Sequence, residues 1–239
     1  MGKEVVGVKI LVADDEKEIA ELVEIILKKE GHEVHKCFDG AAALDAVKTL
    51  GGELDMAILD VMMPVFDGFA LCRKIRERFN FPVIMLTARA EDIDKITGLS
   101  IGADDYITKS FNPLELAARV KAQLRRYKSY NSEPSASIFE YDGLSINKDN
   151  HTCSLFDKEI SLTPTEFNIL WLLCENAGTV VSSEKIFESV WGEDYLDSNN
   201  TVMVHIRRIR EKLGEKPRAP HYITTVWGVG YKIEKPHSK

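Results

Sequence analysis

VKILVADD, residues 8–15, is the stretch that decides the fold of the first half of this chain. Six mostly apolar residues are typical of a strand buried on both faces, yet the run ends in two adjacent acids, Asp14 and Asp15. Two carboxylates about 4 Å apart repel each other by roughly 4 kcal/mol at intermediate dielectric. Water or a cation must therefore screen them.

Four more apolar runs follow, separated by segments with helical periodicity, at residues 33–38, 54–60, 82–88 and 104–109. Five strands that alternate with helices predict an α/β domain, a doubly wound five-stranded parallel sheet with helices on both faces. The last helix is expected to begin at Asn112 and Pro113, with Glu115 at its third position.

The second half opens with short strand candidates, and helices follow. Thr163, Pro164 and Glu166 form a capping box for one helix, and YITTVWGVGYKI at 222–233 is a hairpin signal around Gly228. This order predicts a winged helix-turn-helix domain. We place the first domain at residues 1–127, a polar linker at 128–137 and the second domain at 138–239.

Composition bounds the class of protein. A chain of 239 residues with 44% apolar residues can bury two cores. Its four cysteines show no C-x-x-C spacing and its first residues carry no long apolar stretch, so we expect a reduced, cytoplasmic protein without a membrane span.

The net charge of −7 hides opposite balances along the chain. Residues 131–199 hold 3 Lys and Arg against 13 Asp and Glu, whereas residues 200–239 hold 9 against 3. A phosphate backbone responds to charges within about 10 Å, so the basic C-terminal residues are a candidate nucleic-acid surface.

The carboxyl ends of parallel strands share one edge of the sheet, where ligands bind. Asp14 and Asp15 end the first strand, Asp60 the third, Thr87 the fourth and Lys109 the fifth. Taken singly, each is more simply a solvated surface residue. Together they predict a site in which the Thr87 hydroxyl and the Lys109 ammonium bind phosphate oxygens.

Three carboxylates in one place suit Mg²⁺, which binds oxygen ligands. Asp14 and Asp15 are expected to hold the ion with Asp60, and the backbone carbonyl of Met62 is a further candidate ligand. Asp60 follows a continuous apolar run and lies deepest, so we predict that it is a nucleophile that becomes an aspartyl phosphate.

Residues 5–126 resemble a CheY-like (flavodoxin-like) receiver domain, and residues 138–234 resemble the winged-helix effector of OmpR/PhoB-type response regulators. The motifs that carry the resemblance are LVADDE, ILDVMMPVFDG, IMLTA, GADDYITK, LTPTEF, TVMVHIRRIREKL and TVWGVGYK. Within this family, ITGLSIGADDYITK, LTPTEFNIL and LCENAG are most similar to the regulators of vancomycin-resistance genes.

The resemblance implies a two-component regulator rather than an enzyme, with at most slow self-dephosphorylation. Asp60 would accept phosphate from a sensor histidine kinase, and Thr87 and Tyr106 would reorient as a switch pair. The phosphorylated chain would form a homodimer, bind direct-repeat promoter DNA and act on RNA polymerase. Its dimer interface would include Lys95, Asp105, Glu115 and Arg119.

One position departs from the family. A proline, usually in a cis bond, normally follows the lysine of the fifth strand, whereas this chain has Ser110 after Lys109. A non-proline cis bond costs about 2.5–4 kcal/mol, so either the bond is trans and Lys109 moves or the site is strained. We expect phosphate binding or switching to be altered.

NNTVMVHIRRIREKL, residues 199–213, reads as an amphipathic helix whose core face carries Val202, Ile206, Ile209 and Leu213. The opposite arc is expected to enter a major groove, with arginines reading guanine and binding phosphates. A plain surface helix with charge pairs is the alternative. The residues expected to contact DNA are Asn200, Thr201, Val204, His205, Arg207, Arg208, Arg210, Thr225, Trp227 and Tyr231.

Trp227 stands where related wings often place an arginine for the minor groove, so it either packs against sugar or supports the wing. Trp171 and Trp191 are predicted to be core residues.

Two other functions stay open. An aspartyl phosphatase of the haloacid dehalogenase type would also use Mg²⁺, but it needs a second acid two residues after the nucleophile, where this chain has Met62. A DNA-binding regulator that works without phosphorylation is kept open by Ser110.

Overall fold

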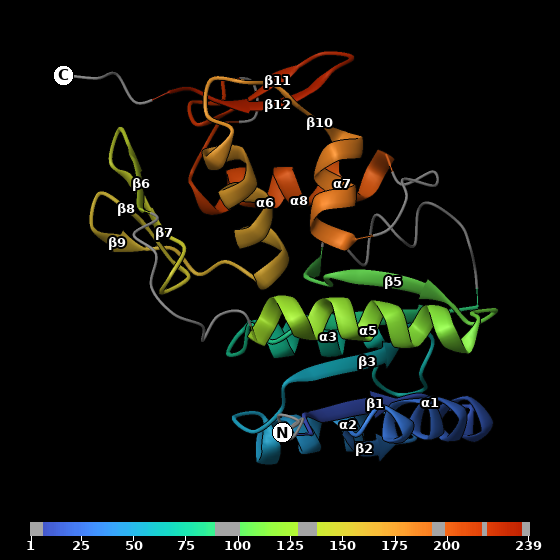
Figure 1. Cartoon of the computed structure of the whole chain (residues 1–239). Helices are drawn as coiled ribbons and strands as arrows, with labels where there is room; N and C mark the ends of the chain where they lie inside the picture. Colours follow the sequence, from blue (N-terminus) through green and yellow to red (C-terminus); the bar gives the residue numbers. More distant parts are fainter. Residues whose placement is uncertain (1–6, 89–100, 129–137, 193–198, 217–218, 236–239) are drawn as a thin grey trace, which may run out of the picture. The chain divides into compact units, whose positions relative to one another are not determined.

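The computed structural model describes residues 7–88, 101–128, 138–192, 199–216 and 219–235 (Figure 1). The chain divides into two compact units, Met1–Tyr127 and Lys128–Lys239. The linker at 128–137 stays a prediction, because residues 129–137 lie outside the described ranges.

The first unit contains a five-stranded parallel sheet in the order β2-β1-β3-β4-β5. Its strands are β1 (Lys9–Ala13), β2 (Glu33–Cys37), β3 (Met56–Asp60), β4 (Val83–Thr87) and β5 (Asp105–Thr108). The register pairs Ala13 with Leu59, Asp60 with Leu86 and Thr87 with Thr108. The strands therefore end level with one another, at one edge of the sheet.

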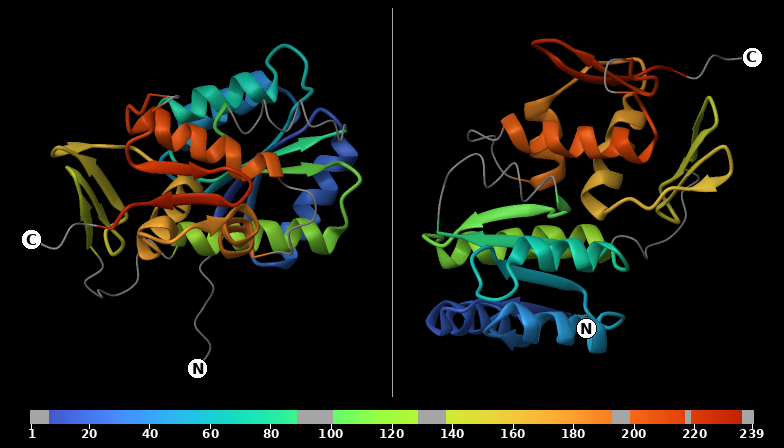
Figure 2. Two further views of the ribbon diagram at one scale, coloured as in Figure 1. Left: turned by 90° about the horizontal axis from the view of Figure 1, so that it is seen from above. Right: turned by 180° about the vertical axis from the view of Figure 1, so that it is seen from behind.

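Four described helices cover this sheet: α1 (Lys17–Lys29), α2 (Gly40–Leu50), α3 (Gly68–Arg76) and α5 (Pro113–Lys128). Helices α1 and α5 pack on one face, against Ile10 and Val12 of β1, and α2 and α3 pack on the other, against Leu11 and Ala13 (Figure 2). The alternation follows from the two-residue period of a strand. The predicted CheY-like doubly wound fold is confirmed.

The second unit opens with an antiparallel sheet, β6 (Ile138–Tyr141), β7 (Leu144–Asn147), β8 (Thr152–Leu155) and β9 (Lys158–Glu159). Three helices follow, α6 (Pro164–Glu175), α7 (Ser183–Trp191) and α8 (Asn199–Lys212). A second sheet joins β10 (Val181–Ser182), β12 (Gly230–Ile233) and β11 (Ile223–Val226) in that order. The predicted winged helix-turn-helix fold is confirmed.

Helix α6 begins as its sequence predicts. The Thr163 side chain accepts a hydrogen bond from the backbone N–H of Glu166, and the Glu166 carboxylate accepts one from the backbone N–H of Thr163 at 2.8 Å. The predicted core is also found, because Trp171, Trp191 and the apolar face of α8 are buried in one cluster.

Glu166 also joins α6 to α8. Its side chain is fully buried, with Lys212 Nζ 2.6 Å from Oε2 and Arg208 Nη2 3.1 Å from Oε1. These two cations keep the pKa of the buried Glu166 carboxyl below its usual value, although burial by itself raises it. A buried carboxylate needs such partners because desolvation of an unpaired charge is expensive.

Glu166→Ala is therefore expected to destabilise the second unit by about 3–5 kcal/mol, because it removes the buried carboxylate that pairs with both Arg208 and Lys212. Urea denaturation followed by tryptophan fluorescence measures this, since Trp171, Trp191 and Trp227 all lie in that unit. The exposed Glu159→Ala is the matched control and should change stability by less than about 0.5 kcal/mol. Equal losses in the two variants would contradict the expectation.

Candidate functional site

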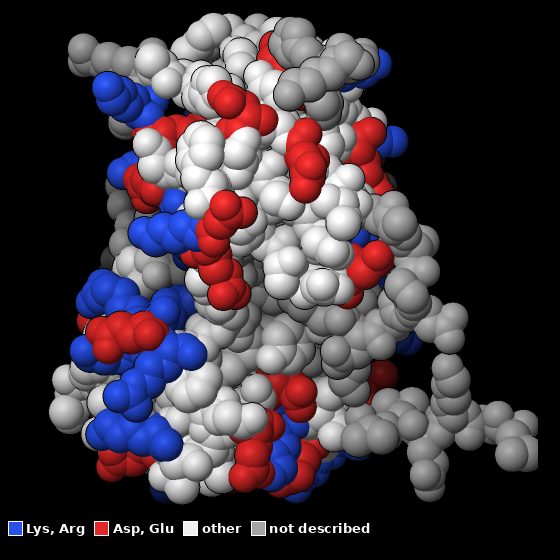
Figure 3. Space-filling model, turned by 90° about the vertical axis from the view of Figure 1, so that its left-hand side faces the viewer, with Lys and Arg blue, Asp and Glu red and all other residues white. Residues whose placement is uncertain are grey.

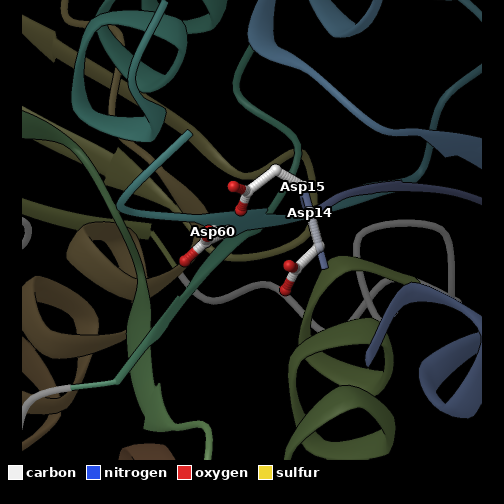
Figure 4. Close-up of side chains that lie close together, drawn as sticks. All are labelled: Asp14, Asp15 and Asp60. Atoms are coloured by element: carbon white, nitrogen blue, oxygen red, sulfur yellow. The ribbon is translucent and has the colours of Figure 1, made fainter. Parts of the chain in front are cut away.

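Three carboxylates meet at the carboxyl edge of the first sheet (Figure 4). Asp14 and Asp15 follow β1, and Asp60 is the last residue of β3. One oxygen from each lies within 4.8 Å of the others. Asp14 and Asp60 are buried, whereas Asp15 is exposed, so the cluster reaches solvent through Asp15.

Lys109 supplies the cation that the acids require. Its Nζ lies 3.0 Å from Asp14 Oδ1, 3.2 Å from Asp60 Oδ2 and 2.7 Å from Glu16 Oε1. The lysine follows β5, so it reaches across the edge of the sheet to the ends of β1 and β3. Its hydrogen bonds to Glu16 and Asp14 raise the pKa of the ammonium above its usual value, against the opposing effect of burial.

One ammonium does not balance this much negative charge. Burial, with the neighbouring Asp14 carboxylate, raises the pKa of Asp60 to about 6. Burial also raises the pKa of Asp14, despite the hydrogen bond from Lys109. The cluster therefore carries its charge at an energetic cost that additional positive charge would relieve.

The cluster could hold a metal ion. Asp14 Oδ2 is buried and accepts no hydrogen bond from any described residue, and Asp60 Oδ2 has the Lys109 ammonium 3.2 Å away. Carboxylate oxygens are ligands that hard divalent cations prefer. The Met62 carbonyl remains a predicted ligand.

Thr87 and Tyr106 lie on neighbouring strands. Thr87 is buried at the end of β4, one residue beyond the partner of Asp60. Tyr106 on β5 is half-buried and packs against the core between the sheet, α2 and α3. Thr87 therefore stands at the same edge of the sheet as the three acids.

The Lys109–Ser110 bond is trans, because the described part of the chain contains no cis peptide bond. The sequence left two outcomes open, a trans bond with a displaced Lys109 or a strained site. The bond is trans, yet Lys109 remains within the acidic cluster. The Ser110 hydroxyl lies 3.2 Å from that of Thr108.

Two residues of this site have contacts that sequence reasoning did not predict. Glu16 binds Lys109, and its position directly after Asp14 and Asp15 was the available signal. The pair Asp67-Gly68 reads as a turn before α3, but Gly68 also packs so closely on the end of β3 that an added Cβ would lie 2.0 Å from the Asp60 carbonyl oxygen.

The predicted nucleic-acid surface lies in the second unit. The prediction that one face of α8 points outward is wrong for part of that face. Val204, His205 and Arg208 are 4%, 0% and 9% exposed. Arg207 is exposed and Thr201 is half-buried. The side chain of Asn200 lies outside the described part of the structure.

The helical wheel failed because α8 packs against both α6 and α7, so more than one stripe is covered. Arg208 turns inward to Glu166, and the His205 ring lies 5.5 Å from that of Trp191. Contacts between these residues and DNA stay predictions.

Arg210 ties α8 to the wing, which is the hairpin of β11 and β12. It donates hydrogen bonds to the Ile223 carbonyl and, at 2.8 Å, to the Thr225 hydroxyl. Its guanidinium also lies 6.0 Å from the centre of the Tyr231 ring, which is mostly buried. Three residues expected to contact DNA are thus engaged with one another.

Glu215 strengthens the same junction, although sequence reasoning missed it. Its carboxylate accepts hydrogen bonds from the backbone N–H groups of His221, Tyr222 and Ile223, and it lies 3.6 Å from Arg210.

On the surface drawn in Figure 3, Lys and Arg side chains lie interspersed with Asp and Glu. Whole-chain charge is therefore a poor guide to where an anion binds.

No helix in the described ranges is long and apolar enough to cross a membrane.

Of the four residues expected in a dimer interface, Lys95 lies outside the described residues. The other three are paired within the chain. Arg119 Nη1 lies 3.2 Å from Asp105 Oδ2, and Arg119 Nε lies 3.1 Å from Glu115 Oε1.

Comparison with known proteins gives the same two parts. Residues 10–121 match the response regulator receiver domain, and residues 157–233 match the C-terminal domain of transcriptional regulatory proteins. The chain is 57% identical to "Regulatory protein VanRc" of Enterococcus gallinarum and 54% identical to "Regulatory protein VanR" of Enterococcus faecium. Each match covers 95% of this chain and 99% of the relative.

Two solved structures are similar over 96% of this chain and 100% of their own. A RitR mutant is 27% identical with a TM-score of 0.74. The response regulator DrrB, described as an OmpR/PhoB homolog of Thermotoga maritima, is 37% identical with a TM-score of 0.49.

The raised pKa of Asp60 predicts how stability depends on pH. Because folding raises this pKa from about 4 to about 6, ionised Asp60 destabilises the fold, with no penalty below about pH 4 and the full penalty above about pH 6. Without metal, Asp60→Asn should thus stabilise the first unit by about 1–3 kcal/mol at pH 7.5 and by much less at pH 4. Calorimetry of the full chain measures this.

The exposed Asp45→Asn is the matched control and should have little effect at either pH. If Asp60→Asn raises the stability of the first unit equally at pH 4 and pH 7.5, repulsion between carboxylates in the cluster is not the cause of the increase.

Proposed function

The chain belongs to the OmpR/PhoB-type response regulators, DNA-binding proteins of two-component systems, and from this we propose that Asp60 accepts a phosphoryl group from a sensor histidine kinase. The observation that carries the proposal is the convergence of Asp14, Asp15 and Asp60 beside Lys109 at one sheet edge. Mg²⁺ is the cation that we propose for this cluster.

In the proposed transfer, a carboxylate oxygen of Asp60 attacks the phosphorus of a phosphohistidine on the kinase. The P–N bond breaks, the imidazole nitrogen leaves with the electron pair, and an aspartyl phosphate forms. Lys109 Nζ, already 3.2 Å from Asp60, and the Thr87 hydroxyl are positioned to bind phosphoryl oxygens. The three acids and the Met62 carbonyl would hold Mg²⁺, which would supply positive charge that offsets the negative charge of the phosphoryl group.

The proposed output begins at Thr87, which turns toward the new phosphoryl group and lets Tyr106 reorient. Asp105, Glu115 and Arg119 now pair within one chain, and we propose that they exchange partners, together with Lys95, when two phosphorylated chains form a dimer.

The dimer is proposed to bind direct-repeat promoter DNA through α8 and the wing and to act on RNA polymerase, in the cytoplasm. The relatives VanR and VanRc suggest glycopeptide-resistance genes as targets. Slow self-dephosphorylation would end the signal.

The family assignment leaves no support for the aspartyl phosphatase alternative. A regulator that binds DNA without phosphorylation is the remaining rival, and the same experiment separates the two.

With beryllofluoride and Mg²⁺ as a phosphoryl mimic, the full chain should bind DNA about 10–100-fold more tightly and elute from gel filtration as a dimer. The DNA is a duplex selected by the wild-type chain from random sequences. Asp60→Asn should lose the response and fail to accept phosphate from a kinase, whereas Asp45→Asn should keep both. Equal affinity with and without the mimic favours the rival.

The trans bond before Ser110 gives a separate prediction. Proline at this position removes a backbone N–H and restricts the backbone of Lys109 to extended conformations, which moves its ammonium. We expect Ser110→Pro to change the rate of phosphorylation by acetyl phosphate about fivefold. Ser110→Ala, which removes only the hydroxyl beside Thr108, should match the parent. Indistinguishable rates for all three proteins would rule the idea out.

A further inference from the structure

The position of the Lys109 ammonium depends on contacts made by its own side chain. The backbone N–H of Lys109 donates to the Thr87 carbonyl at 2.6 Å. The next peptide bond is trans and leads to Ser110, so no proline ring restricts the backbone of Lys109. Because a lysine side chain has a flexible four-carbon stem, its ammonium stays in one place only where partners hold it.

Two carboxylates hold this ammonium. Lys109 Nζ donates to Glu16 Oε1 at 2.7 Å and to Asp14 Oδ1 at 3.0 Å, and Asp60 Oδ2 lies 3.2 Å away. An ammonium has three N–H donors. With Glu16 and Asp14 taking two of them, one is left for Asp60 or for a phosphoryl oxygen bound to it.

The two carboxylates stand in different relations to the metal cluster. The described acids close enough to share an ion are Asp14, Asp15 and Asp60, and Glu16 is not among them. A cation in the cluster would therefore compete with Lys109 for Asp14 but not for Glu16. Glu16 is the partner that keeps its hold on the ammonium when the cluster is filled.

The backbone of Glu16 is itself well fixed. Glu16 is the N-cap residue of α1, and its carbonyl accepts hydrogen bonds from the N–H groups of Ile19 at 3.0 Å and Ala20 at 3.1 Å. Its own N–H donates to Asp14 Oδ1 at 2.9 Å. The Glu16 side chain makes no capping hydrogen bond and reaches Lys109 instead, so it serves the lysine rather than the helix.

Stability does not account for this contact. The Glu16 side chain is 56% exposed, and an ion pair at that exposure contributes little to folding. We infer that Glu16 is a positioning residue, which holds the Lys109 ammonium with one N–H directed to the phosphoryl group on Asp60. The trans bond to Ser110 leaves this task to the side chain. The inference rests on the proposed phosphorylation of Asp60 and deepens it.

Calorimetric titration of the full chain with beryllofluoride in saturating Mg²⁺ tests the inference. Glu16→Gln should weaken binding of the mimic about tenfold, because the ammonium is no longer held in place. Glu16→Asp keeps the charge but is one methylene too short, so it should weaken binding as well. Glu18→Gln removes an exposed acid from the same turn of α1 and should match wild type.

Two measurements separate positioning from a general effect of charge or folding. Glu16→Gln should change the affinity for Mg²⁺ alone by less than about threefold, since Glu16 is outside the group of acids that could share the ion. Its thermal denaturation should match that of wild type, because the side chain is exposed.

A second substitution tests the part assigned to the backbone. Proline at position 110 restricts the backbone of Lys109, so the ammonium should depend less on Glu16. In the Ser110→Pro background, Glu16→Gln should therefore weaken binding of the mimic by less than about threefold.

The failures can be told apart. Wild-type affinity of Glu16→Gln or Glu16→Asp for the mimic overturns the positioning role, as does a loss of Mg²⁺ affinity equal to the loss for the mimic. A tenfold loss that persists beside Ser110→Pro overturns the part assigned to the backbone. A wild-type chain that does not bind the mimic in Mg²⁺ overturns the proposed function itself.

Discussion

Repulsion among carboxylates at one sheet edge is the constraint on which the function of this protein depends. Four neighbouring strands of the first sheet end level with one another, so acids that are far apart in sequence must share a small volume. Lys109 offsets part of this charge, and the pKa of Asp60 stays raised to about 6. The fold thereby keeps a cluster of negative charge that could bind a metal cation.

The second unit uses buried charge differently. Glu166 binds Arg208 and Lys212, and Glu215 lies beside Arg210 and holds three backbone N–H groups near the start of β11. Three cationic side chains of α8, Arg208, Arg210 and Lys212, thus orient the helix and the wing instead of extending into solvent. Preorganisation of this kind lowers the entropy lost when the surface meets its partner.

The two sites depend on different aspects of geometry. In the acidic cluster, the ends of neighbouring strands deliver side chains to a place that parallel pairing determines. In the second unit, what matters is the spacing between α8 and the hairpin, which Arg210 sets through the Ile223 carbonyl and Thr225.

The sequence by itself determined the two fold classes, the helix starts at Pro113 and Pro164 and the identities of Asp14, Asp15, Asp60 and Lys109, because strand periodicity and capping are local properties. Only the tertiary structure decided which side of α8 is covered and that Glu16 joins Lys109. A helical wheel describes one helix, whereas the burial of Val204 and Arg208 depends on everything that packs around α8. Interactions between distant segments leave no pattern along the chain, and for that reason they appear only when it folds.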